Sequence, residues 1–385
     1  MTTPRELALM RLVAQRISGP ACPSAAEAVR WLTAAQAQDF PGAITSIAAR
    51  AGGGGRKSML DALNSAEVVR SWPMRGTLHF VAAEDLRWML ALTGARTLSS
   101  ARARHRALDI DDAAVDHAGT IAREALADGG LGRSELMQAW ERAGIPTANQ
   151  RGQHLLWTLA LTAVVCLGPV DGGTQQVVSF DDWIGSSREL DGGEALGEWA
   201  LRYFRSHGPA TVDDFVWWTK LTVRQARAGL ASAAERLERI VVDGVDYYLD
   251  PATPDLLAAH RRQARGVFLL PGFDEFILGY RDRGAAVDPA FQPRLQPGNN
   301  GMFSPTVVAN GRVVGTWKRR RGAAGGIDAT PFTAFDARTE KAIPGRIRHW
   351  RDAPLRALGH VRPFGIGRRG CLRRAPGTEV VVGAE

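Results

Sequence analysis

Two glutamines spaced two residues apart, Gln36 and Gln38, are the residues of this sequence whose type and spacing best suit chemistry. A glutamine amide donates and accepts hydrogen bonds, but it does not take up a proton at neutral pH. A pair of amides can therefore orient a water molecule and stabilise a developing charge, provided that the leaving group is already activated. The alternative is a pair of surface amides near a helix end, and the local sequence leaves both interpretations open.

The glutamines follow an apolar segment, residues 25–35, whose spacing predicts a helix. On an ideal helix, residues i and i+2 lie about 200° apart, so both amides could not face one target. Pro41, however, disfavours the helical conformation at Phe40, and Gly42 permits a turn. We therefore expect the helix to end near Gln38 and both amides to reach into one cleft.

The composition is that of a soluble globular protein, with 45% hydrophobic and 23% charged residues, and 385 residues suggest two to three domains. The net charge of +8 favours a polyanionic partner such as nucleic acid, although a basic proteome would give the same value. The spacing of Cys22, Cys166 and Cys371 predicts neither a disulfide framework nor a zinc site. Without a signal sequence or a long apolar run, we expect a cytoplasmic protein.

The order of the expected elements, helices followed by a hairpin, recurs three times along the chain. We therefore predict a mainly helical α+β protein of three tandem winged-helix units and a C-terminal β region, C-shaped overall. The predicted winged-helix units are residues 1–95, residues 96–188 with their linking helices, and residues 189–262. Residues 263–360 form the C-terminal β region, and residues 361–385 form a basic tail.

Four stretches in order resemble the bacterial winged-helix DNA glycosylases of the AlkZ-like family, over roughly residues 5–320. The resemblance implies that Gln36 and Gln38 are the catalytic residues. A YcaQ-like sister branch has Gln-x-Asp, so Gln38 places this chain on the AlkZ-like side. The matching stretches are Leu-Thr-Ala-Ala-Gln-Ala-Gln-Asp at 32–39, Arg-Gly-Thr-Leu-His-Phe-Val at 75–81, Leu-Leu-Pro-Gly-Phe-Asp-Glu-Phe-Ile-Leu-Gly-Tyr-Arg-Asp-Arg at 269–283, and Val-Ala-Asn-Gly-Arg-Val-Val-Gly-Thr-Trp-Lys at 308–318.

The resemblance also implies the reaction, which is hydrolysis of the N-glycosidic bond of purines alkylated at N7 or N3. The substrates would be alkylated bases in double-stranded DNA, including bulky adducts or interstrand crosslinks, in repair or in self-resistance to a genotoxin. We expect a monomeric, monofunctional glycosylase that needs no metal or organic cofactor and has no membrane partner. The alternative is a non-catalytic winged-helix transcriptional regulator, which would prefer one operator sequence over a lesion.

Residues near the glutamines have two interpretations each. Arg75 and His79 lie in the second matching stretch, which makes them candidate DNA contacts, but a histidine on a strand is often simply packed. Asp39 could be a general base, but its side chain would point away from Gln38 in a regular backbone, so we expect a structural role.

The dipeptide Asn310-Gly311 is the strongest hairpin signal, because it fits a type I′ turn. One interpretation is a hairpin beside the core; the other, drawn from the family, sends its tip with Arg312 into a DNA groove. The basic residues that follow would then lie near phosphates: Lys318, Arg319, Arg320 and Arg321.

A cluster of charges at residues 274–283 could suggest acid/base catalysis or a metal site, but no histidine accompanies it. An ion-pair network between units is the favoured interpretation. Its members are Asp274, Glu275, Arg281, Asp282 and Arg283.

Overall fold

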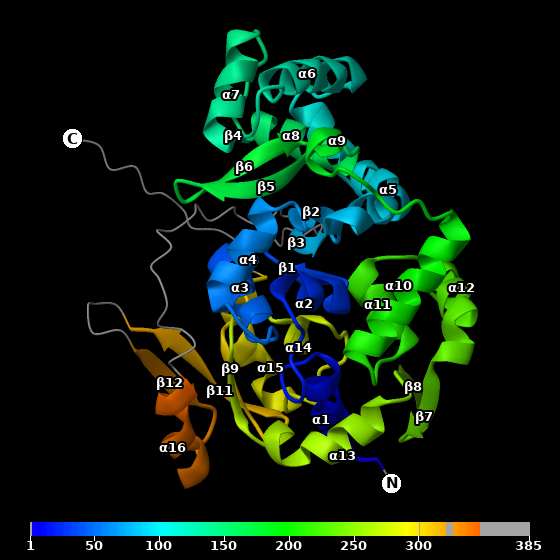
Figure 1. Cartoon of the computed structure of the whole chain (residues 1–385), viewed down its shortest axis with the longest axis vertical. Helices are drawn as coiled ribbons and strands as arrows, with labels where there is room; N and C mark the ends of the chain where they lie inside the picture. The colour runs from blue at the N-terminus through cyan, green and yellow to red at the C-terminus, as the bar shows by residue number, and fades with distance from the viewer. Residues whose placement is uncertain (1, 300, 321–325, 347–385) are drawn as a thin grey trace, which may run out of the picture.

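The computed structural model describes residues 2–299, 301–320 and 326–346. Figure 1 shows a mixed α+β protein with small antiparallel sheets, elongated from α6 and α7 at one end to α1 and α13 at the other. The α+β class predicted from the sequence is confirmed. The predicted basic tail and Arg321 lie outside the described residues.

Helices followed by a hairpin recur three times, as the sequence predicted. The first block contains α1 (Pro4–Ala14), α2 (Ala25–Leu32), β1 (Ala34–Gln36), α3 (Phe40–Ala48), α4 (Gly55–Asn64), β2 (Val68–Met74) and β3 (Thr77–Ala82). The second contains α5 (Leu86–Ala107), α6 (Asp112–Ala125), β4 (Leu131–Gly132), α7 (Arg133–Arg142), α8 (Arg151–Leu161), β5 (Val165–Asp171), β6 (Thr174–Ser179) and α9 (Phe180–Trp183). The third contains α10 (Gly192–His207), α11 (Val212–Thr219), α12 (Val223–Ala233), β7 (Glu238–Val242) and β8 (Val245–Leu249).

The remaining chain adds four α-helices and a four-stranded sheet. Its elements are α13 (Thr253–Ala264), β9 (Val267–Leu270), α14 (Glu275–Leu278), α15 (Gln292–Leu295), β10 (Thr306–Ala309), β11 (Arg312–Arg319), β12 (Ile327–Pro331) and α16 (Ala337–Arg346). Four short 3₁₀ helices complete the described chain, at Ala83–Asp85, Ala234–Arg236, Pro289–Phe291 and Pro297–Asn299.

The segment that carries the glutamines is a strand, not the end of a helix. Helix α2 ends at Leu32, because Thr33 adopts a positive φ of 70°. Residues 34–36 then pair with β3, where Gln36 lies opposite His79. Our prediction that the helix runs on to about Gln38 was therefore wrong: pairing with a strand some 45 residues later overrides the helix preference of an alanine-rich segment.

Asp39 starts the next helix instead of closing the previous one. Its carboxylate accepts a hydrogen bond from Gly42 N at 3.3 Å, which caps the N-terminus of α3. Pro41 is tolerated in the first helical turn, where its missing N–H needs no partner. A Cβ at residue 42 would lie 2.3 Å from Asp39 Oδ2, so glycine allows this close cap and does not form the turn we expected.

The first two hairpins belong to one sheet, with strand order β1-β3-β2-β5-β6-β4. Strands β2 and β5 join the two halves where Arg70 pairs with Leu167. The largest cluster of buried apolar side chains extends from Ala34 to Tyr280 and includes side chains from all three blocks. The blocks therefore share a core, while their boundaries and their assignment as winged-helix units stay predictions.

The second large sheet has the strand order β12-β11-β10-β9, and its turn at Asn310-Gly311 faces the interior. Both turn residues have the positive φ of a type I′ turn, as predicted. The tip packs on α1, where a Cβ on Gly311 would lie 3.2 Å from Leu9 Cδ2. Arg312 donates to the carbonyls of Gly284 and Ala285 at 3.2 and 3.4 Å. The tip thus packs against the rest of the fold, and contact of Arg312 with DNA stays a prediction.

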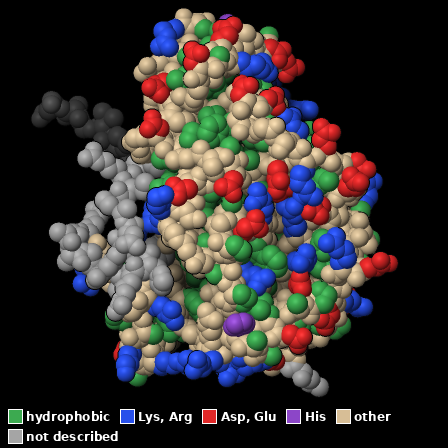
Figure 2. Space-filling view, in the orientation of Figure 1, with side chains coloured by type: hydrophobic (Ala, Val, Ile, Leu, Met, Phe, Trp, Pro, Cys, Tyr) green, Lys and Arg blue, Asp and Glu red, His purple; other side chains and the backbone are tan. Residues whose placement is uncertain are grey.

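Charges of both signs share the face of the molecule that Figure 2 shows. Acidic and basic side chains are interspersed over the right-hand part, where α10 to α12 lie in Figure 1, and a row of basic side chains follows the lower edge. On this face, the net charge of +8 is therefore not gathered into one basic field. Among the described residues, no helix is long and apolar enough to span a membrane.

Candidate active site

Gln36 lies at the end of β1 and is held both through its backbone and through its side chain. Its N–H donates to Glu275 Oε1 at 2.9 Å, and its Oε1 accepts from Arg75 Nη2 at 3.0 Å. Its side chain is only partly buried. Two segments that are remote in sequence therefore fix one partly buried amide, which is the arrangement expected of a residue that must keep a defined orientation.

Gln38 continues along β3 beyond the last paired residue of β1. Ala37 N donates to Leu78 O at 2.7 Å, and Gln38 Oε1 accepts from Leu78 N at 3.2 Å. The side-chain amide thus replaces a backbone acceptor of the sheet. The structure places Gln36 and Gln38 beside β3. That both amides reach into one cleft, as we expect from the sequence, stays a prediction.

The hydrogen-bond partners also fix which way these amides point. A guanidinium group and a backbone N–H can only donate, so the atoms that face Arg75 and Leu78 are oxygens. Gln36 and Gln38 each turn Oε1 toward the protein. For Gln36, the amide nitrogen, a donor, consequently points away from Arg75.

His79 contacts Arg75. Its side chain is fully buried, so in this structure it is not exposed to DNA. Its Nε2 lies 2.9 Å from Arg75 Nη2, and its Nδ1 lies 2.8 Å from Thr77 O. Since arginine only donates, Nε2 accepts and Nδ1 carries the proton. Burial, and then the charge of Arg75, lower the pKa of His79 to about 3, so the imidazole is neutral at pH 7.

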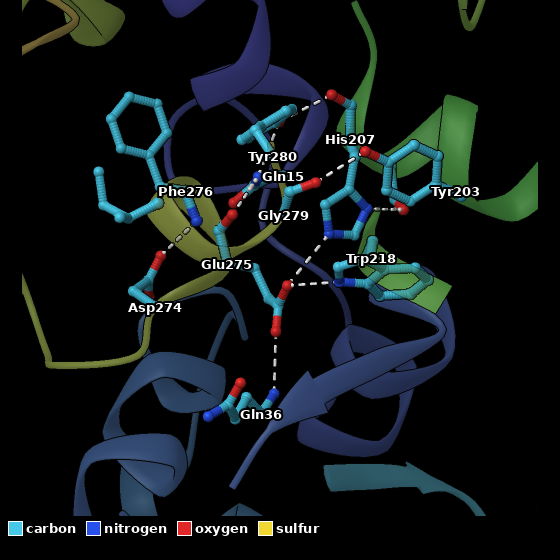
Figure 3. A network of polar contacts seen from close by, with 12 residues as sticks. Gln15, Gln36, Tyr203, His207, Trp218, Asp274, Glu275, Phe276, Gly279 and Tyr280 are labelled. Carbon is cyan, nitrogen blue, oxygen red and sulfur yellow. Dashed lines mark hydrogen bonds and ion pairs between the residues drawn. The ribbon is translucent and has the colours of Figure 1, made fainter. Parts of the chain in front are cut away.

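Glu275 connects Gln36 to helices α10 and α11 through a buried network (Figure 3). Its side chain is 1% exposed. Oε1 accepts from Gln36 N, and Oε2 accepts from Trp218 Nε1 at 2.9 Å. His207 Nε2 lies 3.6 Å from Oε2, close enough for electrostatic attraction. This one carboxylate thus joins three parts of the chain directly behind a candidate catalytic residue.

The network keeps Glu275 ionised. Burial alone would raise its pKa, but the approach of His207, the charge of Arg75 and the N–H of Gln36 lower the pKa to about 2. Burial lowers the pKa of His207 itself. Because both carboxylate oxygens already accept hydrogen bonds from the protein, Glu275 is suited to positioning Gln36 and not to taking a proton from water.

Asp274 belongs to a separate ion pair. Its carboxylate binds both terminal nitrogens of Arg50 at 2.9 Å and Ser46 Oγ at 2.6 Å, and both charged side chains are 1% exposed. Arg281 pairs with Asp213 at 2.7 Å on the surface. Asp274 and Arg281 therefore form ion pairs with residues that are distant in sequence. That this cluster joins separate units stays a prediction.

The predicted DNA contacts are divided between two sheets. Arg75 lies at the turn between β2 and β3, beside Gln36. Lys318, Arg319 and Arg320 are exposed at the end of β11, in the other sheet. Arg320 pairs with Asp328 on the neighbouring strand at 2.8 Å. Among the described residues, no group of three or more His, Cys, Asp or Glu side chains could hold a metal ion.

Sequence reasoning missed two features of the site. Glu275 lies inside a matching stretch, but nothing local indicated that it would reach Gln36, which is 239 residues away. The tryptophan pair at Trp217 and Trp218 carried no motif at all. Trp218 binds Glu275, and the partly buried Trp217 lies 5.3 Å from Arg75, measured from its ring centre to the guanidinium carbon.

Comparison with known proteins identifies the family of this chain. A sequence profile of the family described as DNA glycosylase AlkZ-like matches residues 29–350, which include both glutamines. The chain belongs to the AlkZ-like DNA glycosylase family. Membership identifies an enzyme that acts on N-glycosyl bonds, and it does not favour the alternative of a transcriptional regulator.

A relative and a solved structure support the assignment to the AlkZ-like family. The chain is 27% identical over 327 residues to the interstrand DNA cross-link repair glycosylase of Streptomyces sahachiroi, covering 82% of this chain and 87% of the relative. The solved structure of Streptomyces sahachiroi DNA glycosylase AlkZ matches with a TM-score of 0.75 at 24% identity, covering 90% of this chain and 95% of that chain. The structural likeness shows a shared fold.

Proposed function

We propose that this AlkZ-like glycosylase hydrolyses the N-glycosidic bond of purines alkylated at N7 or N3 in double-stranded DNA, including bulky adducts and interstrand crosslinks. Gln36 and Gln38 are its catalytic residues. The observation that supports this most directly is the double fixation of Gln36, through its N–H by Glu275 and through its amide by Arg75. The crosslink substrates are suggested by the relative from Streptomyces sahachiroi, which is an interstrand DNA cross-link repair glycosylase.

The chemistry suits amides because the leaving group is activated beforehand. An alkyl group on N7 places a positive charge on the purine, so the base leaves as a neutral molecule when it takes the electron pair of the C1′–N bond. Positive charge then develops on the sugar. The oxygen of a water molecule forms the new bond to C1′ and releases its proton to solvent, so the protein supplies orientation and dipoles.

The ionisable groups beside the glutamines agree with such a substrate. The two ring nitrogens of His79 are engaged by Arg75 and Thr77, and the carboxylate of Glu275 is engaged by protein N–H donors. Neither group is placed to protonate a leaving base. We further propose that Arg75, together with Lys318, Arg319 and Arg320, contacts the DNA, and that the product is an intact strand with an abasic site.

The test is release of base from a duplex that contains a single N7-methylguanine, read on a gel after alkaline cleavage, with a crosslinked duplex in parallel. Gln36→Ala and Gln38→Ala should each reduce the excision rate about 100-fold or more, because each removes a group aimed at the transition state. The exposed Gln138→Ala on α7 is the matched control. Unchanged excision by both active-site variants would refute the catalytic assignment, and strand cleavage without alkali would refute a monofunctional reaction.

A further inference from the structure

Three basic side chains from separate segments converge on the ring of Trp217, next to Gln36. The guanidinium carbons of Arg75 and Arg283 lie 5.3 and 5.2 Å from the ring centre, and Lys220 Nζ lies 5.7 Å from it. Arg75 comes from the β2–β3 turn, Lys220 from the end of α11, and Arg283 from the chain after α14. An indole ring attracts cations and thereby groups charges that otherwise repel each other.

Within the described chain, no carboxylate lies within ion-pair distance of Arg75 or Arg283. Burial, and then the nearby charge of Arg75, lower the pKa of Arg283 to about 10. The two guanidinium groups are therefore close enough to repel each other. The acids whose charges act on these two arginines, Glu275, Asp214 and Asp282, already accept hydrogen bonds from the protein, in the case of Asp282 from Gly284 N. Glu275 accepts from Gln36 and Trp218, and Asp214 accepts from the backbone N–H groups of residues 281 and 282.

The two arginines of this cluster have nitrogens that donate no hydrogen bond to the described residues. Arg75 Nε is buried without a hydrogen-bond partner among the described residues. Arg283 uses its Nε to donate to Ile277 O at 2.9 Å, while its terminal nitrogens make no hydrogen bond to the described residues. Its guanidinium carbon lies between two rings, 5.2 Å from the centre of Trp217 and 5.1 Å from that of Phe303. Guanidinium groups bind the oxygens of a phosphate in pairs, and a lysine adds a point charge. Lys220 is exposed and Trp217 only partly buried, so an anion from solution can reach this cluster.

We propose that Arg75, Lys220 and Arg283 bind a backbone phosphodiester of the lesion-bearing strand, beside the nucleotide at Gln36. The inference rests on the proposed function, because it assumes that the lesion lies at Gln36. Arg75 links the two places: it donates to Gln36 and approaches Trp217, so the ring centre is within about 10 Å of the Gln36 amide. Each DNA strand carries a phosphate about every 3.4 Å of helix axis, so a nucleotide at Gln36 brings a flanking phosphate into this range.

The experiment measures binding, which needs no excision. The probe is a fluorescent duplex with one tetrahydrofuran abasic analogue, titrated with wild type, Lys220→Gln and Arg283→Gln at several salt concentrations. Each variant should bind several-fold more weakly and should reduce the slope of log affinity against log salt by about one. Arg262→Gln, which removes an exposed charge on α13 at the far end of the molecule, should change neither quantity.

A chemical substitution in the DNA identifies the phosphate. Replacing single phosphates around the analogue by neutral methylphosphonates should weaken wild-type binding at one position, and Arg283→Gln should lose most of that additional effect. A melting temperature reports whether Arg283→Gln folds; if it does not, the exposed Lys220→Gln decides. Wild-type affinity and salt slope in the variants would overturn the phosphate site. Failure of wild type to excise any lesion would instead count against the proposed function and would leave the binding result valid.

Discussion

The chain at Gln36 and the turn at Asn310-Gly311 owe their conformations to contacts of very different range. The N–H of Gln36 is bonded to Glu275, 239 residues away, and its side chain to Arg75. The turn at Asn310-Gly311 is defined by its own two residues, which have φ values of 51° and 79°. A functional group held by distant residues is sensitive to changes far from it in sequence, whereas a locally encoded turn is sensitive mainly to its own residues.

The largest effect expected from this contrast is at Glu275. Glu275→Gln leaves one carbonyl oxygen where two carboxylate oxygens accepted hydrogen bonds, so the N–H of Gln36 and the indole N–H of Trp218 cannot both be satisfied. We expect kcat for excision to fall about 30-fold while KM changes less than about 3-fold, because a mispositioned amide affects the transition state more than binding.

Trp218→Phe is the matched control, since it removes only the second donor of Glu275 and leaves its bond to Gln36. It should retain most of kcat. Equal losses of kcat in both variants, with lowered melting temperatures, would show that Glu275 supports the fold as a whole and does not position Gln36 in particular.

The second expected effect is a pH dependence of the free energy of unfolding, which arises at His79 beside Gln36 and has no counterpart at the turn. The pKa of the buried His79 is about 3 in the folded protein, below its ordinary 6.5, so the unfolded chain binds a proton more readily. The contribution of His79 to stability is therefore complete above pH 6.5 and is lost as the pH falls toward 3. At pH 5 the loss amounts to about 2 kcal/mol. Glu275 adds little to this loss at pH 5, because its own contribution to stability is lost mainly as the pH falls below its ordinary pKa of 4.5.

Urea unfolding at pH 7 and pH 5 measures this difference. His79→Gln should show a smaller change in the free energy of unfolding between the two pH values than wild type does. The exposed His117→Gln is the control and should behave like wild type. An identical pH dependence in all three proteins would mean that His79 is protonated or exposed in the folded state.

The two regions also show what the sequence could and could not predict. The type I′ turn at Asn310-Gly311 was predictable, because two residues determine it. That its tip packs on α1 was not, since this depends on where α1 lies in the fold. The candidate catalytic pair at Gln36 and Gln38 was suggested by residue type and family resemblance. The strand conformation of residues 34–36 was not predicted, because pairing with β3 outweighs local helix preference.

The smallest expected effect tests the packed hairpin tip. Gly311 has a φ of 79°, and an alanine Cβ there would lie 3.2 Å from Leu9 Cδ2. Gly244, at the turn of the β7–β8 hairpin, has a φ of 78° and no atom within 4 Å of such a Cβ. Alanine at Gly244 therefore has the same unfavourable backbone conformation as alanine at Gly311, but without the close contact. Gly244→Ala should lower the free energy of unfolding by about 1 kcal/mol, and Gly311→Ala by somewhat more.

Because neither turn touches the glutamines, excision rates should stay within about 2-fold of wild type. If Gly311→Ala instead weakened DNA binding without lowering stability, the tip would have to leave α1 and meet the DNA, and the structural role inferred for it would be wrong.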